Sequence, residues 1–476
     1  MSDIMKSIPF GQLTEWILNE YKKTGQVFGI QKAYVADQSK TIEIFGRKLE
    51  NPVGPAAGPH TQLAQNLVAA YVAGARFFEL KTVQKMDGQE LSACIPKPCI
   101  VAEDEAYNCE WSTELYVPQA MEEYIKGWIL IHVIAKEFGI GSPDGFQFNM
   151  SCGYNLEGIK DKKIDDFIEG LKDAGDTAIF KECKQWLLEH ISLFEHVTKE
   201  DVEAIPAKVC NSITLSTMHG CPPQEIENIV RYLLKEKHIN TYVKCNPTLL
   251  GYEFVRKAMD DLGYDYMAFT DFHFKDDLQY EDAVPMLKRL LETAAQEGLS
   301  FGVKLTNTFP VDIKRQELPG EEMYMSGKAL FPLSISVASR LAESFDGKLP
   351  MSFSGGADQK NIDQIVDCGI WPVTVATVLL KPGGYKWMTK IAEKADSCEI
   401  GKCGEVQVET LKKLAEDSLT DAHYRKTGRK AAGKRTEEKS PLLDCLKKNG
   451  VGEKKEFTGH KRVCGNCADV CPNRAN

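Results

Sequence analysis

Runs of apolar, mostly β-branched residues alternate with amphipathic stretches along most of the chain. The sharpest transition follows the apolar run at residues 212–217, where an imidazole, a glycine, a thiol and two prolines come one after another. A helical pattern then begins at Gln224, with apolar residues every three or four positions up to Leu234. Strand-like runs that end in polar groups and lead into helices predict a parallel sheet with helices between its strands.

Nine segments have this strand character. They are residues 51–60, 76–83, 146–150, 212–217, 241–247, 266–270, 301–306, 350–356 and 371–377. A closed (β/α)8 barrel, the α/β fold that we predict, needs only eight, so segments 266–270 and 301–306 compete for one position. Active sites of such barrels lie at the C-terminal ends of the strands, and the polar residues after 217 are therefore expected to face a site. Taken alone, the same residues are also typical of an ordinary turn.

Changes in composition along the chain predict its domain organisation. The barrel is expected over residues 1–395, and the charged, helical stretch 156–208 is longer than a strand-to-helix connection needs. We interpret that stretch as an insertion on the barrel rim. Residues 396–440 are polar and end in a basic run without apolar periodicity, which predicts a linker or an extended arm. Residues 441–476 are expected to form a small iron–sulfur segment, for the reason given below.

The overall composition limits the classes of function. A net charge of −10 over 476 residues argues against a surface that binds nucleic acid non-specifically. The chain has no run of 18 apolar residues and no apolar secretory signal at its start, so we expect neither a membrane span nor export. Fifteen cysteines in such a chain indicate a reducing compartment, and we predict a cytoplasmic protein whose thiols are core residues, metal ligands or catalytic groups.

The C-terminal segment contains a cysteine pattern typical of an iron–sulfur cluster. Cys464, Cys467 and Cys471 follow the spacing C-x2-C-x3-C and precede a proline, like the last three cysteines of a bacterial ferredoxin quartet. Lys461 stands where the first cysteine is expected, and Cys445 is the nearest thiol before it. We predict a [4Fe–4S] cluster on these four cysteines, or one completed by a longer chain or a partner. Zinc binding and plain thiols are the alternatives.

Two stretches of the chain resemble a known family of flavin barrels. Residues 215–220 resemble the L-S-C-P-H-G loop of dihydropyrimidine dehydrogenase, and residues 149–155 are similar to its third-strand loop. The FMN barrel of that enzyme is close to the dihydroorotate dehydrogenases. The whole chain resembles more closely the iron–sulfur flavoproteins described as selenate reductase subunits, which have also been linked to anaerobic purine catabolism. Residues 51–65 and 213–223 carry this second match.

The resemblance implies an FMN cofactor and places residues around it. Lys81 and Lys244 would bring positive charge to the N1/O2 edge of the flavin. Two small-residue pairs would offer backbone N–H groups to the phosphate. The full set implied to bind the cofactor is Ala57, Gly58, Lys81, Thr82, Asn149, Lys244, Asn307, Ser326, Gly327, Gly355, Gly356, Ala376 and Thr377. Without the resemblance, lysines at strand ends are usually exposed rim residues and asparagines there are usually caps.

The central loop departs from the family pattern at the position that matters most for catalysis. Related enzymes use a cysteine or serine there to exchange a proton with a substrate carbon, whereas this chain has Thr217. Thr214 likewise replaces a strand asparagine. The candidates for the acid are therefore Thr217, relaying a proton from water, His219 and Cys221. A barrel that has kept its flavin and lost this chemistry is the other interpretation.

The same resemblance implies a substrate and redox partners. It suggests a planar nitrogen heterocycle as substrate, with electrons exchanged through iron–sulfur clusters. No G-x-G-x-x-G follows a strand, so an NAD(P)H/FAD reductase module is expected on a partner, together with ferredoxin-like or molybdenum-type redox subunits. Two rival hypotheses remain. One is a non-catalytic electron-wiring or structural subunit, and the other is an aldolase or synthase barrel with a Schiff-base lysine at Lys244 or Lys304.

Overall fold

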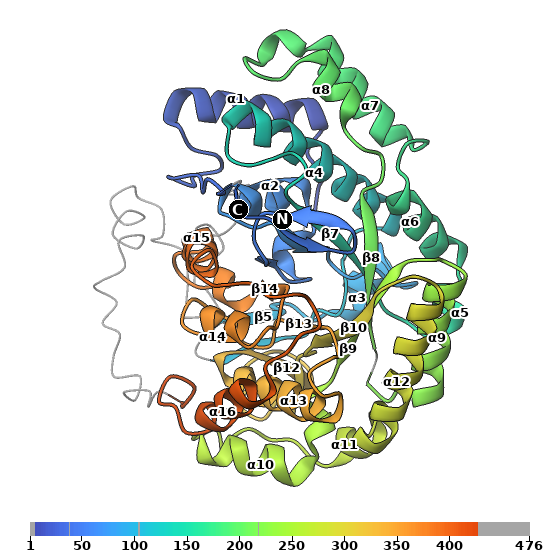
Figure 1. Ribbon diagram of the computed structural model, residues 1–476, viewed down its shortest axis with the longest axis vertical. Helices are drawn as coiled ribbons and strands as arrows, with labels where there is room; N and C mark the ends of the chain where they lie inside the picture. The colour runs from blue at the N-terminus through green and yellow to red at the C-terminus, as the bar shows by residue number, and fades with distance from the viewer. Residues whose placement is uncertain (1–4, 38, 103–104, 218, 427–476) are drawn as a thin grey trace, which may run out of the picture.

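Eight parallel strands form the centre of the molecule, seen in a computed structural model that describes residues 5–37, 39–102, 105–217 and 219–426 (Figure 1). The strands are β3 (Val53–Pro55), β4 (Phe77–Glu79), β7 (Gln147–Cys152), β8 (Cys210–Ser216), β9 (Asn240–Cys245), β10 (Phe301–Leu305), β13 (Met351–Phe353) and β14 (Val373–Val375). Their spatial order is β3-β14-β13-β10-β9-β8-β7-β4. This is the predicted α/β barrel.

The first and last strands of this order meet, which nearly closes the barrel. The backbone N–H of Arg76 donates to the carbonyl of Val53 at 2.9 Å, just before β4 begins. A Cβ atom on Gly54 would lie 1.7 Å from the carbonyl oxygen of Phe77. Only glycine permits so close an approach of two strands, so Gly54 is required where β3 passes β4.

Amphipathic helices cover the outside of the barrel. Those that follow successive strands are α2 (Ala64–Val72), α4 (Val117–Phe138), α6 (Lys162–Lys172), α9 (Pro223–Lys235), α10 (Tyr252–Asp261), α12 (Tyr280–Gln296), α13 (Phe331–Ser344), α14 (Ile362–Asp367) and α15 (Tyr385–Ala395). In α9, Ile226, Ile229 and Leu233 are buried. Their spacing of three and four residues is the pattern that predicted this helix from the sequence.

The competition between two candidate strands is decided in favour of β10. All five residues of β10 are buried, and the strand pairs with β9 on one side and β13 on the other. Residues 266–270 form only an isolated bridge, between Ala268 and Asp312. They lie in the connection between α10 and the short helix α11 (Phe272–Asp276). Both runs are mostly apolar, so composition alone does not separate them. Pairing on both sides places Phe301–Leu305 in the barrel, with its one charged residue, Lys304, buried.

A second, antiparallel sheet covers the mouth of the barrel. Its strands are β5 (Ile100–Ala102), β6 (Glu105–Asn108), β11 (Phe309–Asp312) and β12 (Glu322–Gly327), in the order β11-β12-β6-β5. Strands β5 and β6 come from the connection after β4, and β11 and β12 from the connection after β10. Both connections leave the C-terminal ends of barrel strands, so this cap sheet lies where a barrel places its site.

The opposite end of the barrel is closed by an N-terminal hairpin. Strands β1 (Ile42–Ile44) and β2 (Arg47–Leu49) bring Ile44 and Leu49 against Phe77 and Trp371. The remaining helices are α1 (Phe10–Thr24), α3 (Gly88–Cys94), α5 (Leu156–Ile159), α7 (Ala178–Glu189), α8 (Lys199–Ala204) and α16 (Val408–Ser418), with short 3-10 turns η1 (Pro59–Thr61), η2 (Ile191–Leu193), η3 (Pro247–Leu250), η4 (Lys328–Leu330) and η5 (Thr377–Leu380).

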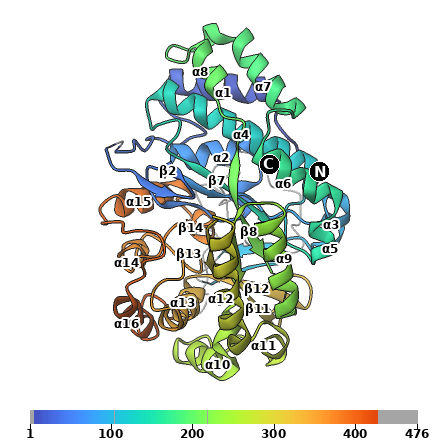
Figure 2. The ribbon, with the colours of Figure 1, turned by 45° about the vertical axis from the view of Figure 1, so that its right-hand side comes forward.

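The expected insertion at 156–208 contains one of the barrel's own helices. Helix α6 packs on α4, β7 and β8, as a barrel helix does. Helices α5, α7 and α8 are additional, and α7 packs on α4 and α1. Figures 1 and 2 show α1, α7 and α8 together at the end of the molecule away from α10 and α11. Sequence periodicity alone does not distinguish a barrel helix from the extra helices that follow it.

Residues 396–426 belong to the barrel, which corrects this part of the linker expected at 396–440; residues 427–440 lie outside the described residues. Helix α16 packs along α13 and buries Leu411. Beyond it, Tyr424 is buried, stacks on Phe331 at 4.6 Å between ring centroids, and accepts a hydrogen bond from Tyr264 at its carbonyl. The few apolar residues of this polar segment are the ones that make these contacts, and they are too few to give a visible periodicity. None of the helices in the described part of the chain has the length and apolar composition needed to cross a lipid bilayer.

Candidate functional site

A cavity of about 990 Å³ lies between the barrel mouth and the cap sheet. Twelve of the thirteen residues expected to bind the cofactor line it. They are Ala57, Gly58, Lys81, Thr82, Lys244, Asn307, Ser326, Gly327, Gly355, Gly356, Ala376 and Thr377. These residues come from both ends of the chain and from most of the strand-to-helix connections between. A cavity of this size at the strand ends can hold a cofactor of nucleotide size together with a small substrate.

Asn149 is the expected cofactor residue that does not line the cavity. Its side-chain amide donates to the hydroxyl of Thr214 at 2.8 Å and to the carbonyl of Met150 at 3.1 Å. Its carbonyl oxygen Oδ1 is buried and has no hydrogen-bond partner among the described residues. Thr214, which replaces the family's asparagine, therefore binds Asn149 inside the barrel.

The cavity floor contains a buried ion pair that includes a residue not foreseen from the sequence. The Lys304 ammonium lies 3.1 Å from Glu79 and donates to the hydroxyl of Thr374 at 2.7 Å, and that hydroxyl donates to Glu79. Burial lowers the pKa of Lys304 to about 8. Glu79 lines the cavity and Lys304 does not. The only signal for Glu79 was a carboxylate inside the apolar run at residues 76–83.

The two strand-end lysines lie at the cavity and not on an exposed rim. The Lys81 ammonium is 2.8 Å from Glu110, a residue of the connection after β6 whose side chain is 7% exposed, and both line the cavity. Lys244 lies on the floor, where burial lowers its pKa and the nearby Glu79 opposes that shift. The positive charge of Lys81 is thus balanced within the protein, which leaves Lys244 as the cation of the floor without an ion-pair partner among the described residues.

One wall of the cavity is made of glycine backbone that packs tightly against its neighbours in the protein. A Cβ atom on Gly356, which has φ +79°, would lie 2.6 Å from the carbonyl oxygen of Gly327, and one on Gly355 would lie 1.8 Å from Ser334 Oγ. Within the described residues the amide of Gly356 donates to no backbone carbonyl. Lysines 328, 360 and 381 line the same cavity. Small residues, a backbone donor and nearby cations are the features of a phosphate site.

The three acid candidates of the central loop do not share one environment. Thr217 and His219 line the main cavity, and the Thr217 hydroxyl donates to the carbonyl of Lys244 at 3.1 Å. Cys221 does not line that cavity but a separate hollow of about 10 Å³. Burial raises the pKa of its thiol to about 11, which keeps it protonated. The structure therefore brings Thr217 and His219 to the site and leaves Cys221 outside it.

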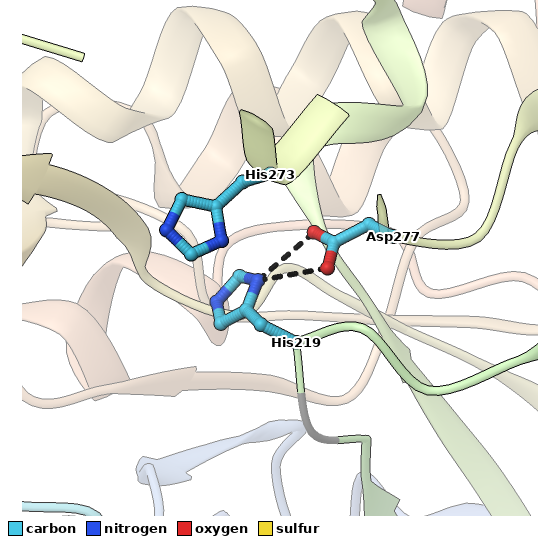
Figure 3. Close-up of side chains that lie close together, drawn as sticks. All are labelled: His219, His273 and Asp277. Carbon is cyan, nitrogen blue, oxygen red and sulfur yellow. Dashed lines mark hydrogen bonds and ion pairs between the residues drawn. The ribbon is translucent and has the colours of Figure 1, made fainter. Parts of the chain in front are cut away.

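His219 is held by a carboxylate that the sequence analysis missed. Its Nδ1 lies 2.9 Å from the carboxylate of Asp277, the residue that follows α11 (Figure 3). Asp277 also accepts hydrogen bonds from Gly220 N at 2.9 Å, Asn246 Nδ2 at 3.0 Å and Thr248 Oγ1 at 2.7 Å. Burial opposes ionisation of Asp277, but these bonds outweigh it and hold its pKa below the ordinary value.

A second histidine lies beside this pair. The ligand atoms of His219, His273 and Asp277 all lie within 4.8 Å of one another, an arrangement that has the composition of a metal site. His273 Nε2 is bonded to Glu322 at 2.6 Å, and the ring of His219 stacks parallel to Tyr324 at 5.9 Å. The cysteines expected to bind an iron–sulfur cluster, Cys445, Cys464, Cys467 and Cys471, lie outside the described residues.

Comparison with known proteins agrees with this architecture. Residues 28–426 match the family model "Oxidoreductase YgfK, N-terminal TIM-barrel domain". The chain belongs to the YgfK N-terminal barrel family. It is 46% identical over 459 residues to the protein named "Putative oxidoreductase YgfK" in Escherichia coli strain K12, and equally to that of strain O157:H7. The match covers 94% of the chain and 44% of each relative, so the chain spans less than half the length of these YgfK proteins.

The boundaries of the YgfK family match also fit the structure. The matched region ends at residue 426, the last residue that the structure describes, and so includes α16 and Tyr424. The family description establishes an oxidoreductase family with a TIM barrel.

Proposed function

We propose that this YgfK-family barrel binds FMN and forms the substrate-reducing or substrate-oxidising part of an iron–sulfur oxidoreductase. The observation that carries the proposal is a single cavity with a phosphate-type wall at one side and a lysine floor at the other. The glycine wall fits the phosphate of a nucleotide because Gly355 and Gly356 present bare backbone to the cavity, and the amide of Gly356 donates to no backbone carbonyl among the described residues. Bound there, FMN would supply hydride transfer.

The residues of the cavity divide into a binding set and a reacting set. Gly356 and the neighbouring lysines would bind the phosphate, and Ser326 and Thr377, whose hydroxyls lie 3.0 Å apart, would complete that wall. Lys244 would stabilise negative charge that develops at the floor. His219 would hold the proton, because its Nδ1 is occupied by Asp277 and only Nε2 is left for a ligand in the cavity.

The substrate that fits best is a planar nitrogen heterocycle of the purine or pyrimidine type. Asn108 and Asn307 line the cavity with amide groups that donate and accept hydrogen bonds, as the N–H and C=O edges of such rings require. Tyr324 and Trp111 add aromatic surface on the cap side, where a flat ring would stack. The resemblance to dihydropyrimidine dehydrogenase points to the same class.

The redox partners belong to the longer protein or to separate subunits. A [4Fe–4S] cluster on the C-terminal cysteines would pass electrons between the barrel and an NAD(P)H/FAD reductase module, with ferredoxin-like or molybdenum-type subunits as further carriers. The relatives are more than twice as long as this chain, which leaves room for such modules.

A visible absorption spectrum of the purified protein tests the cofactor. Flavin bands in the blue, with FMN released on denaturation, are expected, and a broad brown shoulder would report the cluster. A protein that stays colourless after incubation with FMN would overturn the proposal. Retained substrate chemistry is tested next, by photoreducing the flavin without oxygen and adding purines and pyrimidines one at a time.

A non-catalytic electron-wiring role is the second candidate. Thr217 favours it, because a threonine replaces the acid of the related enzymes and its hydroxyl is bonded to a backbone carbonyl. The electron-transfer role would be favoured if no heterocycle reoxidised the photoreduced flavin while a one-electron acceptor did. A Schiff-base role would appear as a covalent adduct after borohydride treatment, and Lys244 is the candidate that lines the cavity.

A further inference from the structure

We infer that the pair His273–Glu322 delivers protons from solvent to the pair Asp277–His219, so that the cavity contains a built-in proton path. The inference rests on the proposed function, because it assumes that His219 gives a proton to a substrate. It adds two residues, His273 and Glu322, that do not touch the substrate and act through His219.

The four residues form two histidine–carboxylate pairs that lie side by side. His273 and Asp277 are four residues apart on α11 and its C-terminal end, and the N–H of Asp277 donates to the carbonyl of His273 at 2.9 Å. This helical spacing places both side chains on one face. Figure 3 shows one ring nitrogen of His273 turned toward Asp277 and His219. The rings of the two histidines are 5.1 Å apart between centroids.

Exposure increases from Asp277 outward to Glu322, and His219 at the cavity is 17% exposed. The Asp277 side chain is 1% exposed, that of His273 20% and that of Glu322 35%. Glu322 is the first residue of β12, an inner strand of the cap sheet, and its carboxylate binds His273 Nε2 at 2.6 Å. The path therefore has two defined ends. Glu322 is in contact with water at one end, and His219, bonded to Asp277, faces the cavity at the other.

The middle of the path is open to one bridging water. Nε2 of His273 is taken by Glu322, and Nδ1 is buried without a hydrogen-bond partner among the described residues. A buried ring nitrogen costs free energy unless it is bonded, so Nδ1 needs a partner from outside the chain. The atoms of the group lie within 4.8 Å of one another, a separation that one water molecule spans.

The charges around His273 favour a protonated ring. The hydrogen bond to Glu322 raises the pKa of His273 above its ordinary value, and burial opposes this less strongly. The groups that face the ring are Glu322 and Tyr324 from β12, Asp276 and Asp277 from α11 and its end, and His219 from the loop after β8. The raised pKa favours the protonated form of His273, which is the form that can pass a proton toward His219.

The proton balance is simple. Addition of hydride to a ring atom of the substrate leaves negative charge on a neighbouring atom, which takes the proton of His219 Nε2. His219 then keeps the proton on Nδ1 that bonds Asp277, and the water bridge carries a proton from His273 Nδ1 back to Nε2 of His219. Glu322 then brings a solvent proton to His273 Nε2. Oxidation of a substrate would run the same steps in reverse.

A bound divalent cation is the competing explanation of the same atoms. The two carboxylate oxygens of Asp277 already accept bonds from four groups, which are His219 Nδ1, Gly220 N, Asn246 Nδ2 and Thr248 Oγ1. A cation would have to displace some of these bonds, and it would also have to displace the proton between Asp277 and His219. The hydrogen-bonded path satisfies the carboxylate without such changes, which is why we favour it.

The first test does not need a substrate. Ring nitrogens of 15N-histidine-labelled protein are followed by NMR through a pH titration, in the wild type and in Glu322→Gln and His273→Gln. The expected result is a lower pKa for His273 in Glu322→Gln and a changed titration of His219 in both variants. His196→Gln, at an exposed histidine near α8, is the matched control. Independent titration of His219 and His273 would overturn the path.

The second test measures the rate at which an accepted heterocycle reoxidises the photoreduced flavin at several pH values. Loss of His219 is expected to cost about 10²–10⁴-fold, and Glu322→Gln about tenfold, growing as pH rises because His273 then loses its proton at lower pH. Added imidazole should restore part of the rate in His273→Gln. A pH profile of Glu322→Gln equal to wild type overturns the path, whereas absence of flavin overturns only the proposed function.

A metal titration separates the competing explanation. Co²⁺ added to the flavin-free protein is expected to give no ligand-field bands that depend on His273. Bands that disappear in His273→Gln would show a metal site at these residues and would overturn the proton path.

Discussion

Glu79 and Lys304 are the buried ion pair beneath the cavity, and each depends on the other. Removal of one partner leaves an uncompensated buried charge, so Lys304→Met is expected to lower the free energy of unfolding by about 3–5 kcal/mol. The double variant Glu79→Gln/Lys304→Met should recover most of that loss, because no charge remains buried. Urea unfolding of the wild type, the single variant and the double variant measures these changes in the free energy of unfolding. Equal midpoints for the single and double variants would contradict this account.

The lowered pKa of Lys304 also gives a pH dependence of known sign. Its pKa falls from 10.5 in the unfolded chain to about 8 in the folded protein. Between these values the unfolded state binds more protons, so this residue makes stability rise as pH increases from about 8 to 10.5. The difference in unfolding free energy between wild type and Lys304→Met should therefore increase over this range. A constant difference would show that Lys304 keeps its ordinary pKa in the fold.

The loop after β8 contains three acid candidates that kinetics can separate. Cys221→Ser is expected to leave the rate of flavin reoxidation within about twofold, because the thiol lies outside the cavity, whereas His219→Gln should lose about 10²–10⁴-fold. Thr217→Ala should have a small effect, since its hydroxyl is bonded to the carbonyl of Lys244. A large loss in Cys221→Ser, with the flavin still bound, would reverse this assignment.

At the residue scale, the sequence located the site better than it identified the chemistry. Residues expected at the cofactor, such as Lys81 and Gly356, could be placed because strand ends of a barrel converge. Asp277 could not, because it lies 58 residues after His219 and its role depends on how α11 folds back over the loop. Asn149 does not line the cavity, because the register of β7 decides whether a strand residue points into the cavity or the barrel; its role at the cofactor stays a prediction.

At the scale of elements, the turn after β13 is the part of the site most sensitive to a single methyl group. Gly356→Ala would put Cβ 2.6 Å from the Gly327 carbonyl, on the wall proposed for phosphate. We expect FMN affinity to fall at least tenfold and the protein to be destabilised beyond the cost of about 1–2 kcal/mol that a left-handed alanine carries. Fluorescence titration with FMN and urea unfolding measure the two effects.

Gly298 provides the matched control for this prediction. It also has a positive φ, +68°, but a Cβ there meets nothing within 4 Å. Gly298→Ala should therefore show the backbone cost alone and bind FMN as the wild type does. Equal FMN affinities for Gly356→Ala and Gly298→Ala would show that the turn does not contact the cofactor.

The strands themselves were predictable because each is an apolar run that ends in polar or small residues. The ninth candidate, 266–270, shows the limit of that pattern. This run is short and mixed in character. Only its pairing with neighbouring strands decides whether such a run joins a sheet. The cap sheet was not predicted at all, since β6 and β12 are more than 200 residues apart and their pairing leaves no local signal.

At the scale of the whole molecule, the barrel is completed by the segment that follows α15, the last of its strand-following helices. Residues 396–426 bury Val406, Leu411, Ala415 and Tyr424 against α13 and its neighbours. Ala422 and His423 of the same segment line the cavity, where His423 lies 3.0 Å from Asp358. The segment is therefore a structural part of the site, although its polar composition is that of a linker.

A pair of shortened chains tests this role. A chain ending at Lys426 retains every contact described here and is expected to unfold at the wild-type urea midpoint and to bind FMN. A chain ending at Ala395 loses two large buried side chains, Leu411 and Tyr424, worth about 1.5–3 kcal/mol each, which is a large share of an ordinary stability of about 5–15 kcal/mol. It should be poorly soluble or unfold at a much lower urea concentration.

Tyr424→Ala in the full chain keeps the backbone, and its free energy of unfolding should fall by about 3–5 kcal/mol, as it does in other truncations of large aromatic side chains. A chain ending at Ala395 with an unchanged midpoint would restore the linker interpretation.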